Sequence, residues 1–194
     1  MIYALLPNKK AETYLKFFEL LKLHITNDPQ SFLIDYEKAV IKPFKHVFGD
    51  DVDISGCYFH LSQNIMKHLK SKPDYLAIIQ NIILYKFVEY LKFLAFVPKD
   101  KVVAAFDRLS LELSKLEFKE SKTLKEIYDY FESNYIGKQQ INGNLRKVPL
   151  FEINMWNCYE RFTRNMPRTT NNVESWHKQF AVNIFFVIIE IYFD

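Results

Sequence analysis

Glycine and cysteine are scarce in this chain, and each scarcity argues against a class of protein. With only 4 Gly in 194 residues, we do not expect a long glycine-rich loop that cradles phosphate. Two cysteines, Cys57 and Cys158, are too few for a disulfide framework, which favours a reducing compartment. No stretch reaches the roughly 20 apolar residues of a membrane span. Met1–Pro7 lacks the basic and apolar regions of a signal peptide, so we expect no leader and no membrane partner.

The chain does have enough apolar surface for a core. Hydrophobic residues make up 49% of the sequence and aromatic residues 16%. At this length, the composition predicts one domain, or one domain with a large insertion. The net charge of +3 permits a nucleic-acid partner without requiring one.

The segment Ser31–His60 predicts a strand–helix–strand–helix unit. The apolar run Phe32–Ile34 predicts a short buried strand that ends at Asp35. A helical pattern, a turn, a second strand at Val52–Gly56 and a helix that opens at Cys57 follow. Such a βαβ unit implies parallel strands. Asp35 would then lie past the carboxyl end of the first strand, where open α/β sheets carry their chemistry.

Two elements are predicted before this unit and a helical region after it. Ile2–Leu6 predicts a strand, and Glu12–His24 predicts an amphipathic helix. From Pro73 to Tyr135 the apolar patterns are helical. The predicted helices of this region and beyond it are Tyr75–Phe96, Lys101–Leu116, Thr123–Tyr135 and Met155–Phe162.

Two carboxylates are the candidates for chemistry, Asp35 after the first strand and Glu174 at the start of a late helix. Carboxylates that hold divalent cations activate water and stabilise the leaving oxygen in phosphoryl transfer. Each residue also has a structural alternative. Asp35 can cap the next helix, and Glu174 can interact with the dipole of its own helix. Spacing alone favours the cap for Asp35.

Four stretches, taken together and in this order, carry a more specific signal. They are YALLPNKKAETY at Tyr3–Tyr14, FLIDYEKA at Phe32–Ala39, GCYFH at Gly56–His60 and RTTNNVESWH at Arg168–His177. In this combination the chain resembles the transposase domain of Mutator-like elements, over all but its tail. Any single stretch would be a weak match.

The resemblance implies a fold and a metal chemistry. The family has a ribonuclease H-like α/β fold and an Asp-Asp-Glu triad that binds two Mg²⁺ or Mn²⁺ ions. By resemblance, Asp35 corresponds to the second Asp and Glu174 to the Glu, as catalytic metal ligands. Cys57 and His60 correspond to the family's Cys-x-x-His motif. The implied segments are 1–72 as the N-terminal core, 73–147 as an all-α insertion, 148–180 as the core segment with the last acid, and 181–194 as an atypical apolar tail.

One departure from the family pattern limits the expected activity. The family's first Asp lies on a strand upstream of YALLP, and the sequence has no counterpart before Met1. The expected fold class is therefore α/β, with an incomplete ribonuclease H-like core that lacks its first strands and a large all-α insertion. Two carboxylates hold two hard cations poorly. We accordingly expect a truncated transposase domain that is inactive by itself.

Cys57 and His60 share a helix face, as a pair of metal ligands would. A zinc site needs four ligands, and Cys158 with His177 would complete a Cys₂His₂ set. The alternative, favoured by spacing, is that Cys57 and His60 pack around their helix.

Basic residues gather near Glu174 and alternate with the aromatic residues Trp156, Tyr159 and Trp176. This pattern suits phosphate contacts and base stacking, and the alternative is a solvated basic loop. The candidate DNA-binding residues are Arg161, Arg164, Arg168 and Lys178.

Three functions therefore remain open. The first is a metal-dependent DNA transposase that cleaves and joins phosphodiesters, and the second is a DNA-binding or regulatory remnant without catalysis. The third is a helical protein-interaction module built on residues 73–135. The resemblance implies DNA as the partner, Mg²⁺ or Mn²⁺ as the cofactor and a nuclear location, and it leaves self-association open.

Overall fold

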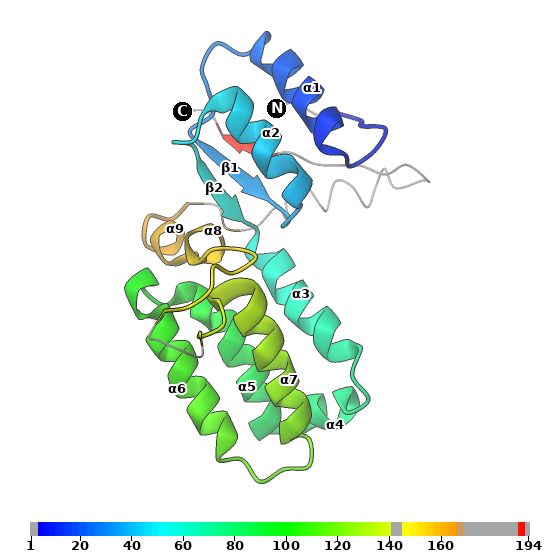
Figure 1. Ribbon diagram of the computed structural model, residues 1–194, viewed down its shortest axis with the longest axis vertical. Coiled ribbons are helices and arrows are strands. Elements are labelled where there is room, and N and C mark those ends of the chain that lie inside the picture. The colour runs from blue at the N-terminus through cyan, green and yellow to red at the C-terminus, as the bar shows by residue number, and fades with distance from the viewer. Residues whose placement is uncertain (1–3, 141–144, 167, 169–189, 193–194) are drawn as a thin grey trace. The chain divides into compact units, whose positions relative to one another are not determined.

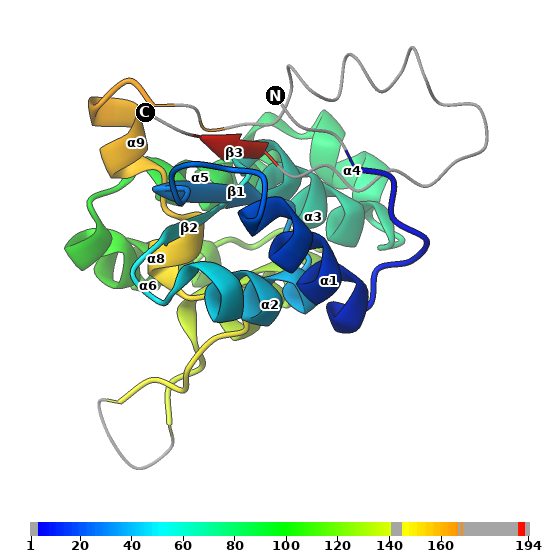
Figure 2. The same cartoon turned by 90° about the horizontal axis from the view of Figure 1, so that it is seen from above.

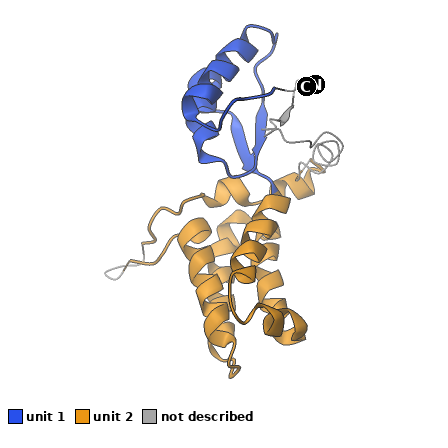
Figure 3. Cartoon of the chain, turned by 90° about the vertical axis from the view of Figure 1, so that its right-hand side faces the viewer, with its two compact units in different colours: residues 1–57, 169–194 blue, residues 58–168 orange. Residues whose placement is uncertain are grey.

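The computed structural model describes residues 4–140, 145–166, 168 and 190–192. The chain divides into two compact units, which Figure 3 shows in two colours. Unit 1 consists of residues 1–57 and 169–194, and unit 2 consists of residues 58–168. Within the described residues, no helix is long and apolar enough to cross a membrane.

Unit 1 is a small sheet with two helices on one face (Figures 1 and 2). The strand order is β2-β1-β3, with β1 and β2 parallel and β3 antiparallel to β1. Its elements in chain order are α1 (Ala11–Lys22), β1 (Ser31–Ile34), α2 (Lys38–Phe48), β2 (Asp53–Gly56) and β3 (Glu190–Tyr192).

Three aromatic rings hold the helices of unit 1 against its sheet. Phe18 lies on α1, Phe32 on β1 and Phe44 on α2, and none is more than 1% exposed. The rings of Phe32 and Phe44 are stacked, with centroids 3.9 Å apart. Phe18 meets these two rings edge-on, at 5.8 Å and 5.2 Å. The helical spacing of the apolar residues on α1 and α2 thus buries one face of each helix on β1.

The chain leaves β1 through a turn in the left-handed region. Tyr36 has a φ of 63°, which is uncommon for a residue other than glycine. Its side chain is 7% exposed and lies against Gly56 at the end of β2. A Cβ atom on Gly56 would come within 2.5 Å of the Tyr36 ring. Glycine at position 56 therefore lets this ring cross the end of β2, and the two residues together shape the turn that carries Asp35.

Unit 2 is a bundle of helices, in which α3, α5, α6 and α7 run alongside one another (Figure 1). Trp156, Tyr135 and Phe131 are its largest fully buried side chains, and the indole N–H of Trp156 donates to the Tyr135 carbonyl at 2.9 Å. Its helices are α3 (Tyr58–Lys70), α4 (Tyr75–Gln80), α5 (Ile82–Phe93), η1 (Leu94–Phe96), η2 (Lys99–Lys101), α6 (Val102–Ser114), α7 (Ser121–Phe131), the π-helical η3 (Glu132–Ile136), α8 (Ile153–Trp156) and α9 (Tyr159–Thr163).

The βαβ unit predicted over residues 31–60 is confirmed. β1 and β2 are parallel, α2 connects them and α3 follows directly. The predicted helix at Glu12–His24 is confirmed as α1. The predicted strand at Ile2–Leu6 is wrong for the described residues 4–6, which have no regular structure. Part of the apolar tail, Glu190–Tyr192, supplies the strand β3 instead.

The predicted helix Tyr75–Phe96 is interrupted at Asn81. This residue is extended, with φ and ψ of −94° and 113°, and it ends α4. Its side chain accepts hydrogen bonds from the N–H groups of Ile83 and Leu84 at 2.9 Å and 3.2 Å, so it also caps α5. An asparagine amide competes with the helical backbone in this way. The sequence pattern did not predict this break, because the apolar residues continue on both sides of Asn81.

The fold class expected from the resemblance, an α/β ribonuclease H-like core with an all-α insertion, is wrong. Most of the described residues are helical, and only β1 and β2 form a parallel pair. An α/β fold of that class needs a larger sheet with helices on both faces. Apart from the βαβ unit, the chain's long apolar patterns have the helical period, which gives such a sheet too few strands. The implied segments 1–72, 73–147, 148–180 and 181–194 stay predictions.

We expect Phe44→Ala to lower the free energy of unfolding by about 3–5 kcal/mol, because it removes a fully buried ring and leaves a cavity. Urea unfolding followed by circular dichroism measures this loss. Leu20→Ala is the matched control, since Leu20 is 56% exposed on α1, and it should change the stability by about 0.5 kcal/mol or less. Equal effects of the two substitutions would contradict the aromatic core described above.

Gly56→Ala should lower the free energy of unfolding by about 1–3 kcal/mol, because its methyl group would overlap the Tyr36 ring. In a Tyr36→Ala background the same change should cost much less. A double-mutant cycle in urea unfolding would then give a coupling energy of about 1–3 kcal/mol. Costs that simply add would show that Tyr36 and Gly56 do not depend on each other.

Candidate metal centre

Asp35 and Cys57 hold equivalent positions at the ends of two paired strands. In the register of the sheet, Ile34 lies opposite Gly56. The residue after each strand is Asp35 for β1 and Cys57 for β2. Both residues therefore leave the sheet at the carboxyl ends of the paired strands. The Cys57 N–H donates to the Ile34 carbonyl at 2.8 Å, which extends the parallel ladder by one bond and fixes the start of the segment that follows.

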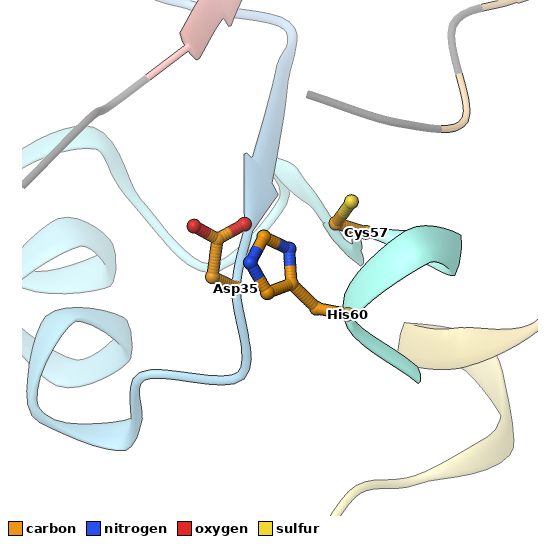
Figure 4. A group of neighbouring side chains, drawn as sticks. All are labelled: Asp35, Cys57 and His60. Carbon is orange, nitrogen blue, oxygen red and sulfur yellow. The ribbon is translucent and has the colours of Figure 1, made fainter. Parts of the chain in front are cut away.

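His60 follows Cys57 by three residues, on the first turn of α3. This spacing brings two side chains to the same face of a helix. One ligand atom each from Asp35, Cys57 and His60 lies within 4.8 Å of the others, and Figure 4 shows the three side chains gathered. The predicted Cys-x-x-His pair therefore has a carboxylate beside it.

The three side chains differ in their exposure. Cys57 is fully buried, His60 is half-buried and Asp35 is exposed. An ion held by them would thus touch the protein interior on the thiol side and water on the carboxylate side.

Tyr14 is a buried tyrosine of unit 1 whose pKa is raised. It lies on α1 and is fully buried. Burial, and after it the negative charges of Glu37 and Asp35, raises the pKa of Tyr14 to about 12. Its hydroxyl therefore stays protonated at neutral pH.

The structural alternative for Asp35, the N-cap of the next helix, is wrong. α2 begins at Lys38, and Glu37 holds the N-cap position. The turn through Tyr36 separates Asp35 from the helix and leaves it at the edge of the sheet.

The other predicted metal ligands are placed as follows. Glu174 and His177 lie outside the described residues, so their roles stay predictions. Cys158 is 1% exposed in unit 2, where its N–H donates to the Ala95 carbonyl at 2.7 Å. Neither cysteine forms a disulfide, and the ligand group found among the described residues does not include Cys158.

The candidate DNA-binding residues have different surroundings. Arg161 is 5% exposed on α9, so it offers little surface to a phosphate. Arg164 is exposed. The Arg168 guanidinium lies over the Phe162 ring, 5.1 Å from its centroid, and Lys178 lies outside the described residues. Trp156 is fully buried in the core of unit 2, which removes it as a stacking platform for a base.

The sequence reasoning missed the meeting of Asp35 with Cys57 and His60. A signal for it was present, because both Asp35 and Cys57 directly follow predicted parallel strands. Pairing those strands in parallel, with their carboxyl ends aligned, would have brought the two residues together. The exact register was the missing information, since a shift of one residue changes which side chains are neighbours.

The group combines a carboxylate oxygen, a thiol sulfur and an imidazole nitrogen in one small volume. These are the donor atoms with which proteins hold divalent cations. In the comparisons with known proteins, no family model, no curated protein and no solved structure matches this chain.

Proposed function

We propose that this chain is a DNA-binding protein of the Mutator-like transposase type, with Asp35 as a ligand for Mg²⁺ or Mn²⁺. The observation that supports the proposal is that Asp35, from the second resembling stretch, lies beside Cys57 and His60 of the third. A nuclear location follows from the DNA partner as part of the same proposal.

The links run from one stretch to the next. Burial, and after it the charges of Glu37 and then of Asp35 in the second stretch, raises the pKa of Tyr14 in the first stretch. Asp35 lies beside Cys57 of the third stretch. The N–H of Tyr58, also in the third, donates to the carbonyl of Arg168 in the fourth at 2.9 Å.

The proposal concerns the site and not the fold class, because function is carried by particular residues and unrelated folds can hold them. A hard cation takes about six oxygen ligands. In the proposal, Asp35, Glu174 and water supply these oxygens. Metal-dependent cleavage of DNA is the reaction that the resemblance implies, and binding of DNA with a cation is the part that we propose for this chain.

The alternative function, protein interaction through unit 2, has weaker support. Leu76, Ile82 and Phe93 are 62%, 73% and 53% exposed. Single exposed apolar side chains are ordinary on protein surfaces. The DNA proposal is preferred because it also accounts for the grouping of Asp35 with Cys57 and His60.

Arg164→Gln should weaken binding to duplex DNA by removing one phosphate contact. The slope of log K against log salt concentration should fall by about one. Fluorescence anisotropy titrations at several salt concentrations measure both changes. Arg108→Gln is the matched control, since Arg108 is an exposed arginine on α6, and it should leave the slope unchanged. Absence of DNA binding by the unsubstituted chain at low salt would contradict the proposal.

Asp35→Asn should abolish calorimetric binding of Mn²⁺, because an amide keeps the shape of the carboxylate and loses its charge. Asp28→Asn provides the control: Asp28 is also an exposed carboxylate of unit 1, and its loss should leave the isotherm intact. If Asp35→Asn leaves the isotherm unchanged, Asp35 is not a ligand of the bound Mn²⁺.

A further inference from the structure

The donor atoms beside Asp35 suit a different metal from the one that the resemblance implies. We propose that Asp35, Cys57 and His60 form a binding site for Zn²⁺ or a similar transition-metal ion. The site has three protein ligands and keeps a fourth position for water. It does not depend on DNA binding, since it rests only on these three side chains and the backbone that positions them.

The backbone already holds two of the ligands in place. Asp35 and Cys57 directly follow the paired residues Ile34 and Gly56. The hydrogen bond from the Cys57 N–H to the Ile34 carbonyl continues this pairing. His60 stands one helical turn further along the same segment. Asp35 and Cys57 each directly follow a strand, and His60 lies on α3, so regular structure adjoins all three positions.

The distances are compatible with one shared ion. Ligand atoms at about 2.0–2.3 Å from a tetrahedral metal lie roughly 3.3–3.8 Å from one another. The ligand atoms of the three side chains lie within 4.8 Å of one another. Closing on an ion therefore needs a movement of about 1 Å, which is within the range of a side-chain rotation at the exposed Asp35.

The ligand chemistry selects the metal. A thiolate and an imidazole favour Zn²⁺ and related ions, whereas Mg²⁺ takes oxygen ligands almost alone. Two of the three donors here, the Cys57 sulfur and a His60 nitrogen, are not oxygen. Asp35 belongs to this group and to the proposed Mg²⁺ or Mn²⁺ site, so the two sites are alternatives for one ion at a time.

The number of ligands indicates an open site. Structural zinc sites are closed by four protein ligands, whereas catalytic ones have three and bind water at the fourth position. The exposed side of this group, at Asp35, leaves room for that water. A metal ion held here would lower the pKa of its bound water below the value in bulk water.

The test is a Co²⁺ titration of the metal-free full chain under reducing conditions, followed by absorption spectroscopy. Co²⁺ replaces Zn²⁺ in such sites and shows a thiolate-to-metal charge-transfer band. We expect this band to saturate at one equivalent of Co²⁺ and to disappear when Zn²⁺ is added. Absence of the band in the unsubstituted chain would overturn the proposal.

Substitutions identify the ligands. Cys57→Ser should remove the band, and Cys158→Ser, the matched control at the other buried cysteine, should keep it. Asp35→Asn and His60→Gln should keep a thiolate band but weaken Co²⁺ binding at least about tenfold. Asp35→Asn is the variant least prone to misfolding, because its side chain is exposed and keeps its shape. The three-ligand site would be overturned if Cys57→Ser kept the charge-transfer band. It would also be overturned if Asp35→Asn left the affinity for Co²⁺ unchanged.

One variant separates this proposal from the DNA function. Arg164→Gln should weaken the salt-dependent binding of DNA and leave the Co²⁺ band unchanged. Loss of DNA binding by the unsubstituted chain, with the Co²⁺ band intact, would overturn the proposed function and leave the zinc-type site standing.

Discussion

The parallel pairing of β1 with β2 is the constraint on which the candidate site depends. Each strand has only four residues, yet their register sets Ile34 opposite Gly56 and sends Asp35 and Cys57 out at the same edge. A shift by one residue would turn one of these side chains to the other face of the sheet. The site is therefore a consequence of strand register, and α3 adds His60 because it begins directly after Cys57.

Packing on either side of the strands keeps this register. The rings of Phe18, Phe32 and Phe44 bury one face of the sheet, so a slipped strand would expose an aromatic side chain to water. At the end of β2, the Tyr36 ring needs the missing side chain of Gly56. The left-handed conformation of Tyr36 costs backbone energy, which the burial of its ring offsets. The aromatic core of unit 1 and the turn at Tyr36 thus favour the same register of β1 and β2.

The two proposed metal sites share Asp35 and differ in their other ligands. The proposed carboxylate-only site would bind Mg²⁺ or Mn²⁺ with Glu174 as a second ligand and would serve phosphodiester chemistry. The proposed mixed site would use Cys57 and His60, whose donor atoms favour zinc. The mixed site has its three ligands within the described residues, and the carboxylate-only site draws on the resemblance to Mutator-like transposases.

The sequence by itself determined the local βαβ unit, the helix α1 and the candidate residues Asp35, Cys57 and His60, because each depends on patterns within a few residues. Only the tertiary structure decided the fold class, the break at Asn81 and the strand formed by Glu190–Tyr192. It also removed Arg161 and Trp156 from the surface and brought Asp35 beside the Cys57–His60 pair. These outcomes depend on the register of strands and on which helix faces pack together. Residues distant in the sequence set both, and local apolar periodicity carries no record of such contacts.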